Sequence, residues 1–396
     1  MVIIMNIWIG NGITVLPEHL YENGSVLIKD GLISGINGKC PANAERIDAC
    51  GGYILPGFID LHVHGGGGSD FMDASPDDML AVARAHCKHG TTALVATTMT
   101  CEDAVLEKVI EAFNIAKDFW SDSAELLGLH LEGPYFASAG KGAQPIGKQR
   151  IPTRKALEHF IAIGKGNILR WDEAPELPNT DVFAQVMKEN GILASIAHTG
   201  AIAAQANAAF DLGFSHITHF YSMTTTGQKI DGVVYSGVNE ATYLNDSITI
   251  ELIGDGKHIP KEHMLLAYKI KGPDKMALIT DAMRAAGTNE TKSILGAKDN
   301  GVDVVVKDGV AQLPDLSFYA GSVATMDRVL RVVHSEYGIP LTDTVKMMTL
   351  TPARIAKCES RKGSIEKGKD ADIVIMNNDF EVQKVFVKGR LCYEQK

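Results

Sequence analysis

The chain of 396 residues is 45% hydrophobic and 22% charged, which is ordinary for a globular protein with a sizeable core. Its 38 basic and 48 acidic residues give a net charge of −10, and this excess of negative charge argues against nucleic acid and against an anionic membrane as partners. The six cysteines form no Cys-x-x-Cys pair, so we expect free thiols in a reducing cytoplasm. The apolar residues 1–15 carry no basic residue and are interrupted by Gly10 and Gly12, which predicts a strand rather than a signal peptide or a membrane span.

Short strands and turns occupy both ends of the chain. Residues 26–29 and 32–34 flank Asp30-Gly31, a pair that supplies the positive φ angles of a type I′ hairpin turn. Residues 371–376 and 385–390 form a similar pair of strand patterns around a polar turn. We therefore expect one small β-sandwich domain built from both termini, residues 1–54 and 358–396.

Between these ends, short apolar strands alternate with helical patterns. Such a βα alternation over roughly 300 residues favours a parallel sheet closed as a (β/α)₈ TIM-type barrel, here residues 55–357. An open doubly wound sheet is the rival, but no Gly-x-Gly-x-x-Gly with strand and helix flanks supports it. The expected strands are 93–97, 126–131, 193–197, 217–220, 248–253 and 276–280; the expected helices are 76–89, 101–118, 153–163, 181–190, 201–212, 260–271, 322–337 and 341–357.

The clearest chemical signal is His62-Val63-His64, which ends a buried strand pattern. Residues two apart on a strand face the same side, so both imidazoles project together and suit a metal ion. A His-x-His pair alone proves little, but Glu132, His198 and His219 each close a later strand. Because the strand ends of a (β/α)₈ barrel meet at one face, the sequence predicts a metal site there.

Other polar residues near strand ends have several possible roles. Asp281 follows the strand 276–280 and is expected to be the general base for a metal-activated water, although it could also cap a turn. His216 competes with His219, but their parity differs, so we expect His216 to pack or hydrogen-bond instead. His130 lies deeper than Glu132 and is expected in the core or behind the ligands.

Residues 56–65, Pro-Gly-Phe-Ile-Asp-Leu-His-Val-His-Gly, resemble the opening signature of the amidohydrolase superfamily. Later motifs resemble those of the N-acetylglucosamine-6-phosphate deacetylase family, and the similarity extends nearly from end to end. These motifs are residues 129–135, 141–144, 197–199, 218–221, 255–258, 280–283, 320–322 and 351–353.

The resemblance implies specific roles for the site residues. Glu132, His198 and His219 would hold the metal that all members share, and His62 with His64 would add a second ion bridged through Glu132. Imidazole and carboxylate ligands suit Zn²⁺ or Fe²⁺. Asp281 would be the base, and the family commonly forms homodimers. The expected substrate contacts are Gln144, Ser222, Met223, Lys229, His258, Ala320 and Gly321, although a surface position is nearly as plausible for His258 from the sequence.

One segment departs from the family pattern. Members usually carry, after the sixth strand, an arginine that binds the sugar phosphate, often from a partner subunit, whereas residues 221–232 contain none. Lys229 could supply a charge there but lacks the bidentate fork of arginine. Lys141, Lys148 and Arg150 are further candidates.

The sequence therefore predicts a metal-dependent deacetylase of N-acetylglucosamine 6-phosphate, with an unphosphorylated or different N-acetyl sugar as the alternative substrate. A non-catalytic binding barrel is a weaker rival because all six metal and base residues are retained. A cyclic-amide hydrolase such as a dihydroorotase is disfavoured because those enzymes usually carry a carboxylated lysine where this chain has Glu132.

Overall fold

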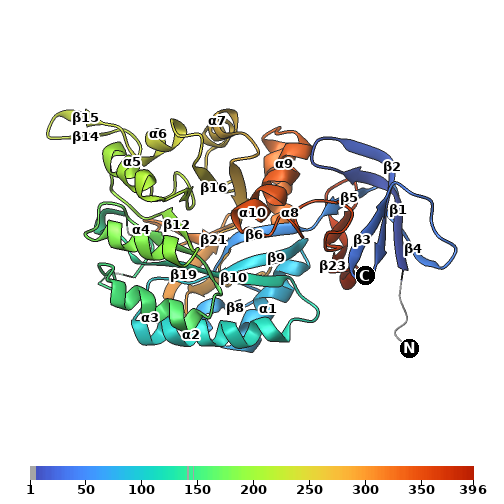
Figure 1. Ribbon diagram of the computed structural model, residues 1–396, viewed down its shortest axis with the longest axis horizontal. Coiled ribbons are helices and arrows are strands. Elements are labelled where there is room, and N and C mark those ends of the chain that lie inside the picture. Colours follow the sequence, from blue (N-terminus) through green and yellow to red (C-terminus); the bar gives the residue numbers. More distant parts are fainter. Residues whose placement is uncertain (1–5, 141, 146) are drawn as a thin grey trace.

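The computed structural model describes residues 6–140, 142–145 and 147–396. Eight parallel strands form its central sheet, in the order β17-β16-β13-β12-β11-β10-β9-β6 (Figure 1). A parallel bridge between Val63 and Ala282 brings the two edges of this sheet together. The predicted (β/α)₈ barrel is confirmed. Its strands are β6 (Phe58–Val63), β9 (Thr91–Thr97), β10 (Glu125–Tyr135), β11 (Ile168–Glu173), β12 (Leu193–Ile196), β13 (His216–Ile217), β16 (Thr249–Ile253) and β17 (Met276–Ile279).

Helices pack around the barrel, and local capping explains where several begin. Ser75 accepts a hydrogen bond from the Asp78 amide and Pro76 follows at the first helical position, while Thr153 caps the third helix in the same way. The helices are α1 (Pro76–Cys87), α2 (Asp103–Ala116), α3 (Arg154–Gly164), α4 (Thr180–Glu189), α5 (Ala203–Leu212), α6 (Val238–Tyr243), α7 (Lys261–Lys271), α8 (Met326–Leu330), a π-helical turn (Arg331–Glu336), α9 (Leu341–Met348) and α10 (Leu350–Ile355), with short 3₁₀ turns at Phe71–Asp73, Lys117–Phe119 and Ser138–Gly140.

Some elements differ from those expected from sequence. Strand β11 was not predicted, because Arg170 and Asp172 break the apolar run that marks a buried strand. The helix expected over residues 341–357 is interrupted at Thr349, whose φ of −138° is not helical. The strand expected over 217–220 ends at Ile217.

Four antiparallel strands were also not expected between β17 and α8. They are β18 (Lys292–Leu295), β19 (Val302–Lys307), β20 (Val310–Gln312) and β21 (Tyr319–Ser322). The main-chain bridge between Ala282 and Ser322 attaches this sheet to the barrel just after β17. The insertion therefore stands beside the carboxyl ends of the barrel strands.

Both termini contribute to one further eight-stranded sheet, which lies at the right of Figure 1 in blue and red. Strand β5 pairs with β1 on one side and with β22 on the other, so the two chain ends meet at its centre. This agrees with the β-sandwich expected from the termini. Its strands are β1 (Asn6–Val15), β2 (Leu20–Lys29), β3 (Leu32–Ile36), β4 (Ala44–Asp48), β5 (Tyr53–Pro56), β22 (Ile373–Met376), β23 (Val382–Val387) and β24 (Arg390–Glu394).

Two small hairpins complete the described chain. Strands β7 (Gly65–Gly66) and β8 (Ser69–Asp70) follow the His-x-His strand directly. Strands β14 (Gln228–Ile230) and β15 (Val233–Tyr235) form a hairpin that projects from the body of the molecule (Figure 1). Within the described ranges, no helix combines the length and the apolar character that crossing a membrane requires.

Candidate active site

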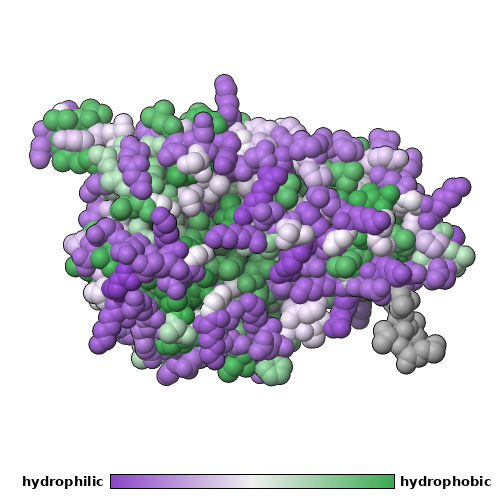
Figure 2. Space-filling view, in the orientation of Figure 1, coloured by the Kyte–Doolittle hydropathy of each residue, from purple (hydrophilic) through white to green (hydrophobic). Residues whose placement is uncertain are grey.

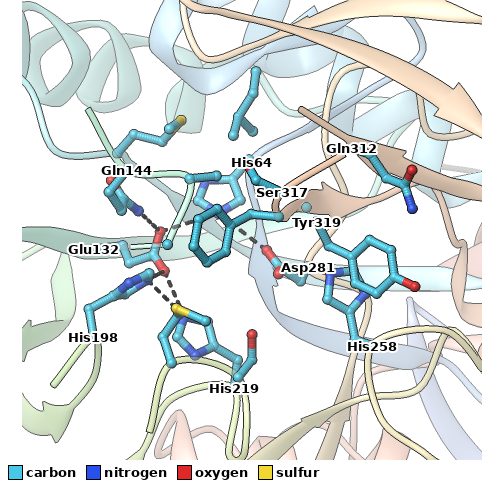
Figure 3. Close-up of a pocket in the computed structure, with 18 of the residues that line it drawn as sticks. His64, Glu132, Gln144, His198, His219, His258, Asp281, Gln312, Ser317 and Tyr319 are labelled. Atoms are coloured by element: carbon cyan, nitrogen blue, oxygen red, sulfur yellow. Dashed lines mark hydrogen bonds and ion pairs between the residues drawn. The ribbon is translucent and has the colours of Figure 1, made fainter. Parts of the chain in front are cut away.

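Six side chains that the sequence singled out meet at the carboxyl ends of the barrel strands. Figure 3 shows five of them, His64, Glu132, His198, His219 and Asp281. The Nε2 atoms of His62 and His64 lie 3.2 Å apart, and those of His198 and His219 lie 3.1 Å apart. The Oδ1 atom of Asp281 lies 3.4 Å from Nε2 of His62 and 3.3 Å from Nε2 of His64. All of these residues are buried. The structure thus gathers residues from across more than 200 positions of sequence into one cluster.

Glu132 stands between the two histidine pairs. Its Oε1 atom lies 3.0 Å from Nε2 of His198 and 2.9 Å from Nε2 of His219, while Oε2 lies 3.3 Å from Nε2 of His64. Gln144 holds this carboxylate by donating from Nε2 to its Oε2 over 2.8 Å. The amide of Thr100 in turn donates to Oε1 of Gln144. Glu132 is therefore fixed as a bridge between the two pairs.

The backbone at three of these residues adopts a left-handed conformation. The φ angles are 46° at His198, 30° at His219 and 51° at Asp281. Residues other than glycine seldom adopt this region, and such strain concentrates at functional sites. Each residue lies two positions after the end of a strand, so the turn at its own Cα sets where its side chain points. A regular strand pattern could not predict these directions.

The electrostatics of the cluster favour a bound cation. Burial acts to raise the pKa of Glu132, but hydrogen bonds from His198 and His219 hold it well below its usual range. Burial acts to lower the pKa of His64, but the hydrogen bond to Asp281 and the charge of Glu132 raise it to about 9. The pKa of His219 is raised to about 9 as well, since the hydrogen bond and charge of Glu132 outweigh burial. The buried carboxylates therefore require positive charge beside them, as protons or as metal.

The donor atoms also fit metal geometry. Two groups share Glu132, one with His62 and His64 and one with His198 and His219, and within each group the ligand atoms lie within 4.8 Å of one another. Ligands at the usual distances from a tetrahedral zinc ion are roughly 3.3–3.6 Å apart. The pairs of imidazole nitrogens, at 3.1–3.2 Å, are close to this spacing. The residues present thus fit a divalent metal, in agreement with the metal dependence expected from sequence.

The cluster opens into a cavity of about 420 Å³, a size that suits a small-molecule ligand. Of the predicted substrate contacts, Gln144, Ser222, Met223, His258 and Gly321 line it. The other two predicted contacts lie elsewhere. Ala320 is fully buried and is not among the lining residues, while Lys229 lies on the exposed hairpin strand β14.

The cavity wall also contains residues that the sequence did not single out. Gln312, Ser317 and Tyr319 come from the β18–β21 insertion, and Figure 3 shows Tyr319 beside His258. The Tyr319 and His258 rings lie 4.9 Å apart. His258 Nδ1 donates to the buried carboxylate of Asp255 over 2.7 Å, which leaves Nε2 free to meet a ligand. Only the tertiary fold reveals this wall, because the loop before β21 has no chemical motif of its own.

Positive charge is scarce around this cavity. Among the lining residues that the structure describes, none is a lysine or an arginine. Lys148 forms an ion pair with Glu102 and Arg150 one with Asp103, both outside the cavity. Lys141, the remaining candidate, lies outside the described residues.

His216 is buried and hydrogen-bonded, as expected, but the strand parity from which this was expected does not hold. Both His216 and His219 point into the barrel, because β13 ends at Ile217 and the left-handed turn at His219 breaks the strand parity. His216 accepts a hydrogen bond from Arg170, whose other terminal nitrogen donates to His130. His130 is buried, as expected, with its ring 4.8 Å from that of His62.

The chain is similar to known proteins over nearly its whole length. The model of the amidohydrolase family matches residues 53–392. The chain belongs to the amidohydrolase family. An N-acetylglucosamine-6-phosphate deacetylase from Lysinibacillus sphaericus is 34% identical to this chain, and the alignment covers 93% of each protein. An N-acetylgalactosamine-6-phosphate deacetylase from Escherichia coli O157:H7 is 29% identical, with 95% of this chain and 96% of that protein covered.

Solved structures of this amidohydrolase group also match. A mutant N-acetyl-D-glucosamine-6-phosphate deacetylase from Mycobacterium smegmatis, in complex with N-acetyl-D-glucosamine-6-phosphate, has a TM-score of 0.89 and 26% identity, with 98% of this chain and 99% of that chain covered. The resemblance drawn from the sequence motifs is confirmed.

Proposed function

We propose that this chain hydrolyses the acetamide of N-acetylglucosamine 6-phosphate to acetate and glucosamine 6-phosphate. The observation that carries the proposal is the Glu132-centred cluster, with Asp281 at its edge, at the base of a sugar-sized cavity. The named deacetylases with which the chain aligns from end to end support the same reaction.

Two divalent ions, Zn²⁺ or Fe²⁺, are proposed for the two ligand groups. His198, His219 and Glu132 would hold one ion, and His62 and His64 would hold the other, with Glu132 shared between them. A bound ion of this kind acidifies water and polarises the carbonyl that is attacked. The neutral imidazoles and single carboxylate of each group are typical ligands for these metals.

Asp281 is proposed as the general base. Burial acts to raise its pKa, but the charge of His62 and the hydrogen bond from His64 hold it below its usual value. It is therefore ionised at neutral pH and can accept a proton from the attacking water. As the C–N bond of the acetamide breaks, Asp281 returns that proton to the departing nitrogen. His258, oriented by Asp255, is placed to hold the sugar during this step.

The sugar phosphate requires a cation from outside the described cavity wall. We propose a homodimer in which the β14–β15 hairpin reaches a second copy and places Lys229 near its site. The hairpin exposes 54% of Val233 and 76% of Val234, and Figure 2 shows apolar side chains gathered on this projection. Covering these side chains would stabilise such a contact. We also propose the division into a terminal domain, residues 1–54 and 358–396, and a barrel, residues 55–357.

The test measures acetate release from four sugars by the zinc-loaded and iron-loaded protein: N-acetylglucosamine and N-acetylgalactosamine, each with and without the 6-phosphate. A strong preference for N-acetylglucosamine 6-phosphate is expected. A preference for the galactose epimer would place the chain with its galactosamine-specific relatives. Equal rates on the neutral sugars would refute the phosphate requirement, and no release from any of them would refute the deacetylase proposal.

A further inference from the structure

A buried ionic network lies beneath the metal-binding cluster, inside the barrel. Its centre is Arg170 on β11, which is 4% exposed and forms an ion pair with Glu251 on β16, which is 0% exposed. Sequence motifs did not point to either residue. Two charges buried together are costly unless each makes further hydrogen bonds, so the remaining contacts of this pair show what it holds in place.

The arginine determines the tautomers of its histidine neighbours. A guanidinium can only donate hydrogen bonds, so Nδ1 of His130, 2.7 Å from Arg170, must carry a lone pair. His130 Nε2–H then donates to Asp172 over 2.8 Å. By the same reasoning His216 accepts from Arg170 at Nε2 over 3.0 Å and donates from Nδ1 to Thr249 over 2.7 Å. Each proton in this part of the network has one consistent position.

Glu251 connects this network to the metal-binding cluster. The Oε1 atom of Glu251 accepts a hydrogen bond from Arg170, and its Oε2 atom lies 3.4 Å from Nδ1 of His62. A carboxylate paired with arginine accepts hydrogen bonds only, so Nδ1 of His62 must carry the proton. The lone pair of His62 is then on Nε2, the atom that faces His64 and Asp281.

We infer that Glu251, held by Arg170, is a positioning residue that fixes His62 as a ligand of the ion bound with His64. The inference rests on the proposal of two ions. Arg170 also helps to hold His62 in place, because it donates a hydrogen bond to the carbonyl of Leu61, the residue directly before His62. His198, in the other ion group, donates from Nδ1 to the main-chain carbonyl of Gly140 over 2.8 Å. The two groups therefore depend on different supports, and a change at Glu251 should affect only one.

Replacing Glu251 with glutamine makes this dependence measurable. Glutamine has one acceptor oxygen, which cannot serve both Arg170 and His62. If that oxygen stays with Arg170, the amide NH₂ faces Nδ1 of His62 and favours a proton on Nε2, where the ion should bind. Partners behind metal ligands typically contribute 10–100-fold in metal affinity. We expect Glu251→Gln to weaken Zn²⁺ at the His62–His64 position about 10–100-fold, with the affinity of the second zinc unchanged.

The experiment titrates metal-free protein with Zn²⁺ against a competing chelator and measures bound zinc by elemental analysis. Asp172→Asn is the matched control, because Asp172 is equally buried in the same network but contacts His130, Ser195 and Thr218 rather than a proposed ligand. This variant should lose stability but keep both ions at wild-type affinity. If Glu251→Gln does not fold, Glu251→Asp replaces it, because aspartate keeps two acceptor oxygens but holds them one methylene farther from His62. This variant should weaken the binding of the same zinc ion.

Each outcome of the titration bears on the inference. Loss of one zinc from Glu251→Gln alone supports it. Three results would overturn the role of Glu251 while leaving the two-ion proposal intact. In the first, Glu251→Gln binds two zinc ions with unchanged affinity; in the second, it loses both ions. In the third, Asp172→Asn loses zinc to the same extent as Glu251→Gln. A wild-type protein that binds one zinc, with His62→Asn binding equally well, would overturn both the two-ion proposal and the role of Glu251.

Discussion

Asp281→Asn is the substitution that most directly tests the proposed chemistry. Asparagine has the shape of aspartate, so the side chain should stay near the His62 and His64 nitrogens that Oδ1 now meets at 3.4 and 3.3 Å. It cannot accept the water proton as a carboxylate does. General bases contribute about 10²–10⁴ in rate, which corresponds to roughly 3–5 kcal/mol in the activation free energy.

The structure also predicts what this substitution leaves intact. Neither of the two ligand groups includes Asp281, so the bound metal should be unchanged. Acetate release from N-acetylglucosamine 6-phosphate should fall about 10²–10⁴-fold in kcat, with KM changing far less. Asp211→Asn on the exposed surface of α5 controls for expression and metal loading. A fully metal-loaded Asp281→Asn protein with kcat within about tenfold of wild type would refute the base, and loss of metal would make Asp281 a ligand instead.

Three further predictions concern specificity, acid stability and the join between the sheets. Lys229→Ala should raise KM for the 6-phosphate about 10–100-fold, because a charge-assisted contact contributes about 1.5–3 kcal/mol. The kinetics on N-acetylglucosamine should stay unchanged, and equal effects on both sugars would contradict this prediction. Burial lowers the pKa of His86 to about 4, so the unfolded chain binds its proton first and stability is lost as pH falls from about 6.5 toward 4. His86→Gln should remove up to about 3 kcal/mol of that loss. The measurement is the free energy of unfolding of the two metal-free proteins, from denaturant titrations at each pH. If their unfolding free energies fall in parallel with pH, the role of His86 is refuted. Lys362→Met should lower the free energy of unfolding by about 3–5 kcal/mol, because it leaves the buried Asp372 carboxylate without its ion-pair partner. Lys384→Met, at an exposed pair, should change it by less than about 1 kcal/mol.

Much of the site could be predicted because barrel topology simplifies the problem. Once the βα alternation indicates a parallel barrel, every strand end lies on one face. His62, His64, Glu132, His198 and Asp281 could therefore be grouped without knowing their distances. Their residue types then indicated a metal, since imidazoles and carboxylates in such a group have few other uses.

Other features resisted prediction because they depend on contacts between distant segments. Strand β11 was missed because Arg170 looks like a surface residue until Glu251, 81 positions later, is placed beside it. His216 and His219 both point into the barrel, against the expected strand parity, because a left-handed turn at His219 replaces a regular strand. Local patterns carry no information about either event.

The sequence by itself determined the barrel, the terminal β-domain and the residue types of the metal-binding cluster, because hydrophobic periodicity and strand-end motifs are local properties of the chain. Only the tertiary structure decided which walls enclose the cavity, since Tyr319 and Gln312 reach it from an insertion but belong to none of the motifs in the sequence. Tertiary structure likewise decided that no described lysine or arginine lines that cavity and that Glu251 stands behind His62. The physical reason is the same in each case: distance, burial and hydrogen-bond direction are set by segments far apart in sequence, and they exist only after the barrel has closed.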